Sequence, residues 1–104
     1  MSRYRILDEA VADLDAAMSW YEEQREGLGR ELLAEFRERV NGALEMPGRG
    51  SPAGFTPGGA EIRRYRFKRF KRYTILMATI DGVPTVLVVE HSSRLPGFWL
   101  DRLK

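Results

Sequence analysis

The chain has 104 residues, of which 31% are charged and 43% are hydrophobic. This length and composition suit one hydrophobic core, so we expect a single domain spanning residues 1–104. The absence of cysteine and the single histidine exclude disulfides, thiol catalysis and the usual zinc sites, and neither metal nor cofactor is expected. No apolar run approaches the roughly 20 residues of a membrane helix and no signal-peptide pattern is present, so a soluble cytoplasmic protein is expected.

The net charge of +2 averages two regions of opposite sign. Residues 8–45 contain 11 acids and 4 bases, a net charge of −7. Residues 63–72 contain 7 bases and no acid. This asymmetry predicts one acidic surface and one electropositive surface, the second suited to a polyanion or an acidic peptide.

The first half of the chain is typical of a short strand followed by a helical hairpin. Residues 4–7 have the composition of a strand, and Asp8 is expected to cap the following helix. Apolar residues in that helix recur at three- and four-residue steps, as Val11, Leu14, Met18 and Tyr21 do. Residues 27–29 interrupt this pattern, and a second helical series runs over residues 32–44. Two helices joined by a short glycine turn pack as an antiparallel hairpin.

The second half is typical of a three-stranded meander. Residues 46–59 contain so many prolines and glycines that a loop is expected. Strands are predicted over residues 62–68, 73–79 and 84–91, the last two joined by an Asp81-Gly82 turn. The last strand does not alternate between apolar and polar residues, so we expect it to be central and the best buried.

The element order β-α-α-β-β-β indicates an α+β fold. We expect an α-helical hairpin, with Trp20 and Tyr21 facing the sheet, to pack on one face of a twisted antiparallel sheet. Alternation in the first strand of the meander places Tyr65 and Phe67 on that covered face. The arginines then lie on the other face.

The basic segment over residues 63–72 is the strongest candidate for a binding site. Its cations alternate with aromatic rings, a combination that binds phosphate and stacks on bases. The alternative is a solvated sheet face above an aromatic core. Seven neighbouring bases repel one another, which favours a binding role. The candidate target-binding residues are Arg63, Arg66, Lys68, Lys71, Arg72 and Tyr73.

The segment after the last strand offers a second set of polar residues. His91 has the pKa range of a general acid or base near neutral pH, but no acid, histidine and nucleophile pattern supports catalysis. The alternative is a structural histidine bonded to the backbone. Phe98 and Trp99 are expected to close the core, and Ser92 and Ser93 to make turn hydrogen bonds.

Two stretches of the chain then carry a family pattern. One is residues 20–29, Trp-Tyr-Glu-Glu-Gln-Arg-Glu-Gly-Leu-Gly, and the other is the closing His91-x-x-Arg94-x-Pro96-x-Phe98-Trp99. Together they resemble the RelE/ParE superfamily of bacterial toxins, in the right order over nearly the whole chain. The resemblance implies a type II toxin–antitoxin system, in which a cognate antitoxin protein holds the toxin inactive in a hetero-oligomeric complex. It also implies an α-helical hairpin on an antiparallel sheet.

Members of this superfamily divide by target. RelE-like toxins are ribosome-dependent mRNA endoribonucleases, and that resemblance implies Arg64, Arg69 and Arg94 as catalytic residues. In this alternative His91 is the candidate proton carrier. ParE-like toxins bind DNA gyrase. The chain end departs from the nuclease pattern, because Phe98 and Trp99 stand where a tyrosine is expected. We therefore expect ParE-like growth inhibition, with RelE-like cleavage and an inactive toxin retained for binding as the alternatives.

Overall fold

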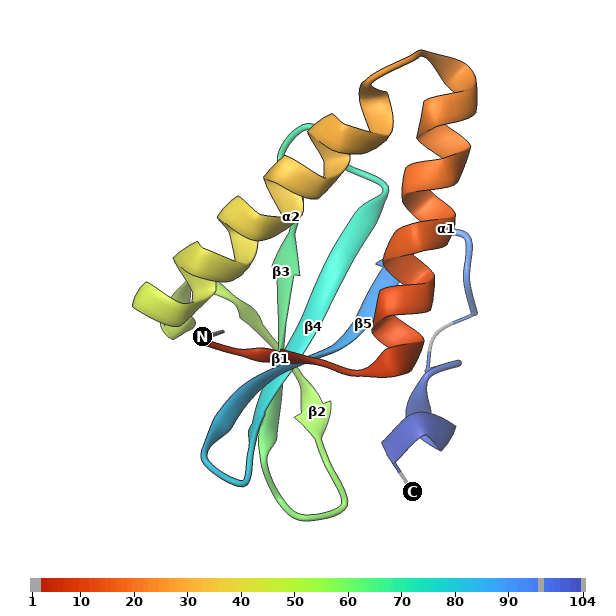
Figure 1. The fold of residues 1–104 in the computed structure, drawn as a ribbon. Coiled ribbons are helices and arrows are strands. Elements are labelled where there is room, and N and C mark those ends of the chain that lie inside the picture. The colour runs from red at the N-terminus through yellow and green to blue at the C-terminus, as the bar shows by residue number, and fades with distance from the viewer. Residues whose placement is uncertain (1–2, 96, 104) are drawn as a thin grey trace.

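A computed structural model describes residues 3–95 and 97–103. Over these residues, two helices pack on a five-stranded sheet (Figure 1). In chain order the elements are β1 (Arg5–Ile6), α1 (Asp8–Gln24), α2 (Leu28–Glu45), a 3-10 turn (Pro47–Arg49), β2 (Ser51–Phe55), β3 (Glu61–Arg66), β4 (Tyr73–Ile80), β5 (Val83–His91) and a second 3-10 turn (Leu100–Leu103). The α+β fold is thereby confirmed, with one strand more than expected.

The glycine turn determines how closely the two helices approach each other. Gly27 precedes α2 with a φ of +87°, a left-handed conformation that favours glycine. A Cβ on Gly29 would lie 2.6 Å from the carbonyl oxygen of Met18, so only glycine fits where α2 crosses α1. The Glu22 carboxylate accepts the backbone N–H of Gly27 at 2.8 Å and that of Gly29 at 3.0 Å. Figure 1 shows the helices meeting at this turn and spreading apart over the sheet.

The start of α1 differs from the expectation. Leu7 occupies the N-cap position and no side chain caps the helix, whereas Asp8 is the first helical residue. Its carboxylate still lies in the first turn beside Glu9, where the helix dipole favours negative charge. Asp8 therefore stabilises α1 through the dipole and not as a cap.

The strand order is β1-β5-β4-β3-β2, and β1 runs parallel to β5 while the other neighbours are antiparallel. The sheet is therefore mixed and not wholly antiparallel. The central strand is β4, so the expectation that the last strand is central was wrong; β5 lies between β4 and the two-residue β1 and has the longest buried run of the strands. The Asp81-Gly82 turn has φ values of 52° and 77°, as expected for the predicted hairpin.

Strand β2 lies in the segment that was expected to be a loop. It pairs with β3 at the edge of the sheet, with a register shift between Pro52 and Gly54. An edge strand tolerates proline, because the N–H that proline lacks is not needed on the outer side. The expectation of an irregular loop over residues 46–59 was therefore wrong for residues 51–55, whereas no strand or helix forms over residues 56–59.

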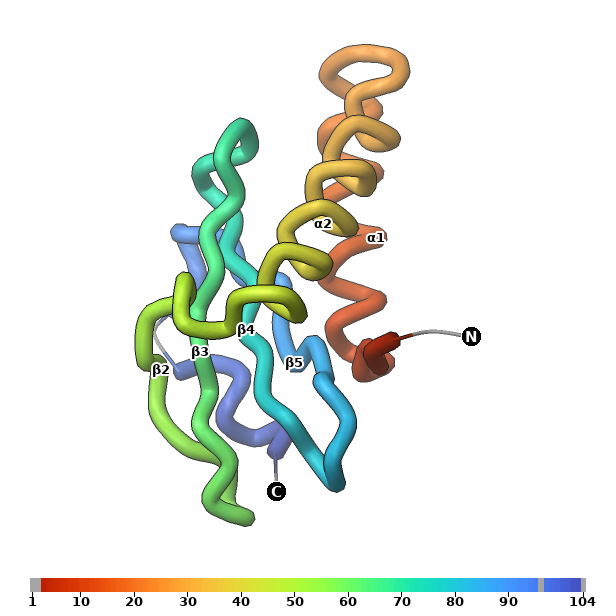
Figure 2. Tube along the Cα trace, turned by 90° about the vertical axis from the view of Figure 1, so that its left-hand side faces the viewer, coloured from red at the N-terminus to blue at the C-terminus, as the bar shows by residue number. Residues whose placement is uncertain are grey.

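The sheet has a hydrophobic core on each face. On one face, Leu14 of α1 and Phe36 of α2 pack with Ile75 and Val89 of the sheet, and Figure 2 shows both helices on this side. On the other face Trp99, only 5% exposed, packs with residues of β3, β4 and β5. The prediction that Trp99 closes the core is confirmed, so the arginines share their face with a second apolar cluster.

Trp20 does not pack against the sheet as expected. Its side chain is 54% exposed and touches the ring of Tyr21 edge-on at 5.0 Å between centroids. Tyr21 instead turns toward the sheet, where its ring lies 4.8 Å from Phe70. An indole on the surface of α1 is therefore open to a partner.

Candidate functional site

Strand β3 divides its side chains between the two faces of the sheet. Tyr65 and Phe67 pack into the core beneath the helices, as predicted. Arg64 and Arg66 line a cleft of about 470 Å³ on the opposite face. Burial raises the pKa of Tyr65, whose hydroxyl donates to the carbonyl of Pro47 at 2.9 Å.

This sheet-face cleft brings together four of the ten candidate site residues, two from strand β3 and two from the end of β5 and the segment after it. Its polar lining comes from strands β3, β4 and β5 and from the segment that follows β5, and Trp99 forms part of its wall. The polar side chains are those of Arg64, Arg66, Thr74, Glu90, His91, Ser92 and Arg94. The cleft thus holds three arginines and one carboxylate.

Arg69 lies outside the sheet-face cleft. Its guanidinium pairs with Glu31 of α2 and lies 5.4 Å from the centroid of the Phe70 ring. The hydrogen bond from Arg69 lowers the pKa of Glu31. The structure therefore does not assemble Arg64, Arg69 and Arg94 into one site.

A second carboxylate of α2, that of Glu35, holds the backbone of the turn between β3 and β4. Glu35 accepts the backbone N–H of Lys68 at 2.7 Å, that of Arg69 at 3.0 Å and that of Phe70 at 3.2 Å. Lys71 and Arg72 follow in the same turn and are exposed. Sequence reasoning missed Glu35, because it is more than 30 residues distant along the chain from the groups that it binds.

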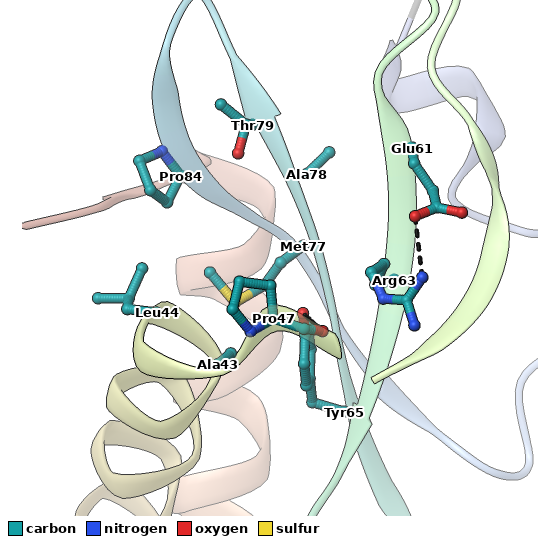
Figure 3. Close-up of a pocket in the computed structure, with 10 residues that line it drawn as sticks. All are labelled: Ala43, Leu44, Pro47, Glu61, Arg63, Tyr65, Met77, Ala78, Thr79 and Pro84. Carbon is teal, nitrogen blue, oxygen red and sulfur yellow. Dashed lines mark hydrogen bonds and ion pairs between the residues drawn. The ribbon is translucent and has the colours of Figure 1, made fainter. Parts of the chain in front are cut away.

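Arg63 points toward the helix side of the sheet. It donates to Glu61 at 2.9 Å and to the carbonyl of Gly50, beside a small cavity of about 140 Å³ that Tyr65 and Met77 also line (Figure 3). Arg63 therefore lies apart from Arg64 and Arg66, and the expectation that the arginines lie on the uncovered face was wrong for Arg63.

His91 makes local contacts at the end of β5. Its Nδ1 accepts the backbone N–H of Ser93 at 3.0 Å and lies 2.7 Å from the Ser93 hydroxyl. Because Nδ1 accepts an N–H, a neutral imidazole carries its proton on Nε2. The ring also lies edge-on to Tyr73 at 4.9 Å between centroids. The bond to the Ser93 backbone agrees with the alternative that His91 is a structural histidine, and it places Ser93 in the turn as expected.

Tyr73 is a packing residue as well as a candidate. Its ring contacts those of Tyr21, Phe67 and His91, and burial raises the pKa of its hydroxyl. A groove of about 720 Å³ between α1 and the end of β5 exposes part of this ring, together with Trp20 and Arg72.

The segment after β5 is tied to α1 by an ion pair. Arg102 donates to both carboxylate oxygens of Asp13, at 2.7 and 2.9 Å, and to the carbonyl of Leu87 at 3.3 Å. Asp13 also accepts the N–H of Val89 at 3.1 Å. Because β1 pairs only with Thr85 and Val86, the Asp13–Arg102 pair supplies hydrogen-bond partners to backbone groups further along β5. Hydrogen bonding to Asp13 raises the pKa of Arg102.

The same segment positions Arg94 at the sheet-face cleft. The guanidinium of Arg94 lies 4.6 Å from the centroid of the Phe98 ring, and that of Arg102 lies 5.3 Å from it. A cation over an aromatic face is stabilised by the ring quadrupole. Phe98 therefore holds two arginines that are eight residues apart in the sequence.

Within residues 3–95 and 97–103, no three histidine, cysteine or acidic side chains group as a metal site would need. In the same part of the chain, no helix has the length and hydropathy needed to cross a membrane.

The architecture defines a class of protein. A helical hairpin on one face of the sheet, with arginines in a cleft on the other, is the arrangement expected of RelE/ParE superfamily toxins. Residues 4–96 match the family model described as ParE toxin of type II toxin-antitoxin system, parDE. The chain therefore belongs to the ParE toxin family and, as a type II toxin, has a protein antitoxin as its partner. No curated protein matches it.

Proposed function

We propose that the protein inhibits growth by binding DNA gyrase in the cytoplasm, and that a cognate antitoxin relieves this inhibition. Family membership supports a toxin, and the composition of the sheet-face cleft supports binding over cleavage. Arg69, which the nuclease alternative requires, is paired with Glu31 outside the cleft. The ring of Trp99 forms the cleft wall, where a nuclease of this superfamily is expected to offer a tyrosine hydroxyl.

The proposal assigns target binding to cations at and around the sheet-face cleft. Arg66 and Arg94 line it, and Lys68, Lys71 and Arg72 extend the charge along the turn after β3. Charges presented on one surface speed association with an acidic target and orient it. Arg63 and Tyr73 contribute by shaping the sheet, because both are engaged in internal contacts.

The test is a gyrase supercoiling assay with the purified chain. We expect inhibition by the unmutated protein and weaker inhibition by Arg94→Ala. Arg37→Ala, which removes an exposed charge from α2 away from the cleft, serves as the control and is expected to inhibit normally. Normal supercoiling in the presence of folded, unmutated chain would contradict gyrase as the target.

A second candidate function, RelE-like cleavage of mRNA on the ribosome, has one observation in its favour. Arg64, His91 and Arg94 do line a single cleft, where two guanidinium groups suit the charge of a pentavalent phosphate. Under this alternative, Arg94→Ala lowers cleavage by on the order of 100-fold while ribosome binding changes much less. Robust cleavage by the unmutated chain in a ribosome-programmed assay would establish this alternative.

The antitoxin is tested by co-expression with the reading frame beside this one. Expression of the toxin alone is expected to arrest growth, and co-expression is expected to restore it and to yield a complex that co-purifies. Normal growth with soluble, folded toxin alone would count against toxicity and favour an inactive toxin retained for binding.

A further inference from the structure

A second basic site lies beside the sheet-face cleft, on the other side of the edge of strand β3. The end of α2 and the turn after it lie beside β3 (Figure 2), and together they enclose a groove of about 540 Å³. Five of the side chains that line it are cations and none is an acid. We call this the β3-edge groove, and its cations are Arg39 of α2, Arg49 of the Pro47–Arg49 turn, Arg64 and Arg66 of β3, and Lys68.

Among the described residues, no ion pair neutralises the cations of this groove. Elsewhere in the described chain Arg63, Arg69 and Arg102 each pair with a carboxylate. Within residues 3–95 and 97–103, none of the five cationic side chains of the groove forms an ion pair or donates a hydrogen bond, although the backbone N–H of Lys68 donates to Glu35. Five like charges at close range repel one another, so the groove is stabilised by whatever anion neutralises it.

Arg39 provides the most specific sign of a missing acceptor. Its Nε is buried and has no hydrogen-bond partner among the described residues. A buried N–H without a partner costs free energy, and the cost is larger for a charged group. An anionic oxygen that entered the groove would remove this cost. The neighbouring Arg37, also on α2, is exposed and does not line the groove, so it is a natural comparison.

The lining suits a chain of phosphates better than a peptide. Peptide grooves offer apolar pockets for alternate side chains. Here the lining other than the cations is small or hydroxylic, as at Ser51, apart from the ring of Tyr65. Arg64 and Arg66 are two residues apart on a strand, about 6.6 Å. Phosphates of one strand of duplex DNA advance by about 3.4 Å each along the helix axis, so two cations at this spacing can reach different phosphates of one strand.

The groove is continuous with the sheet-face cleft. Arg64 and Arg66 line both, so the cations form one track from Arg39 on α2, over the edge of β3, to Arg94 beyond β5. A track of this kind follows a polymer of negative charge and not a single small anion.

We infer that the β3-edge groove binds the sugar–phosphate backbone of nucleic acid without sequence preference. The choice of duplex DNA as the ligand rests on the proposed function, because duplex DNA is the substrate of gyrase. Arg39 and Arg49 are the residues that this inference adds, because neither lies in the basic segment over residues 63–72. The contacts carry no base-specific information, since all five cations are suited to phosphate oxygens.

The test is the binding of purified chain to a labelled duplex of about 20 base pairs, measured by fluorescence anisotropy between about 50 and 200 mM salt. With four or five phosphates neutralised, log K should fall with log salt with a slope of about −4. Arg39→Ala should reduce that slope by about 0.9 and weaken binding several-fold, because one phosphate contact is lost. Arg37→Ala, with the same change in net charge on the same helix, should leave the slope unchanged.

Arg49→Ala is the second variant, because Arg49 is exposed and its replacement is expected to leave the fold intact. It should repeat the effect of Arg39→Ala, and thermal melting should show both variants folded. Equal losses for Arg37→Ala and Arg39→Ala would overturn the inference, because they would indicate a general charge effect. So would the absence of duplex binding combined with Arg39-dependent binding of a poly-glutamate peptide, since the groove would then serve a protein. Tighter binding of single-stranded RNA than of the duplex would overturn the assignment to DNA.

The two proposals fail separately. Groove-dependent DNA binding without inhibition of supercoiling would refute gyrase as the target and leave the groove intact. Inhibition of supercoiling that Arg39→Ala and Arg49→Ala do not affect, without DNA binding by the unmutated chain, would refute the groove and leave the proposed target intact.

Discussion

Replacing Asp13 by alanine tests how the segment after β5 is held on the sheet. The Asp13 and Arg102 side chains are 8% and 16% exposed, and Asp13 also accepts the N–H of Val89. The substitution leaves a mostly buried guanidinium and a backbone N–H without their acceptor. Removing one partner of a buried ion pair costs about 3–5 kcal/mol. Arg102 keeps some solvent contact and its bond to the Leu87 carbonyl, so we expect about 3 kcal/mol.

The free energy of unfolding is measured by urea denaturation, with the slope m expected to stay constant. Asp15→Ala is the matched control on the same helix, because Asp15 is exposed, and it should change stability by about 0.5 kcal/mol or less. A double-mutant cycle with Arg102→Ala should give a coupling of about 1–3 kcal/mol, because each single variant already removes the interaction. Additive losses, or an Asp13→Ala effect no larger than that of Asp15→Ala, would refute this account of the contact.

Two further predictions concern the helical hairpin. Gly29→Ala should destabilise the chain by about 1–3 kcal/mol, because the added Cβ meets the backbone of α1. Gly42→Ala should instead stabilise the chain by about 0.5–1 kcal/mol, because the space around Gly42 is open and alanine favours a helix. Thermal melting measures both changes. Hydrogen bonds from the N–H groups of Gly27 and Gly29 lower the pKa of Glu22 in the folded chain. The ionised Glu22 carboxylate therefore stabilises the fold fully above the ordinary pKa of glutamate, and this stabilisation is lost as the pH falls through the lowered pKa of the folded chain. Glu22→Gln should therefore flatten the loss of stability below about pH 4.5, and an unchanged acid profile would show that the carboxylate does not contribute.

Local features of the sequence were sufficient for much of the fold. The spacing of Leu14 and Phe36 within their helical series placed both in the core beneath the hairpin. The Asp81-Gly82 turn has the positive φ values that its residues favour. Alternation in β3 correctly separated Tyr65 from Arg64. All three features follow from the period of a helix or strand or from the backbone conformations that a residue favours. Neither the period nor the backbone preference depends on distant parts of the chain.

Tertiary structure alone decided which candidate residues share a site. Arg69 belongs to the same basic segment as Arg64, but Glu31 of α2 holds it on the other side of the sheet. Arg39 enters the β3-edge groove only because the end of α2 lies beside β3. Asp13 meets Arg102 across 89 residues of sequence. Periodicity tells which face of an element a side chain occupies, but not which elements meet there. That depends on how the chain closes on itself to bury its two apolar faces and to pair its buried charges.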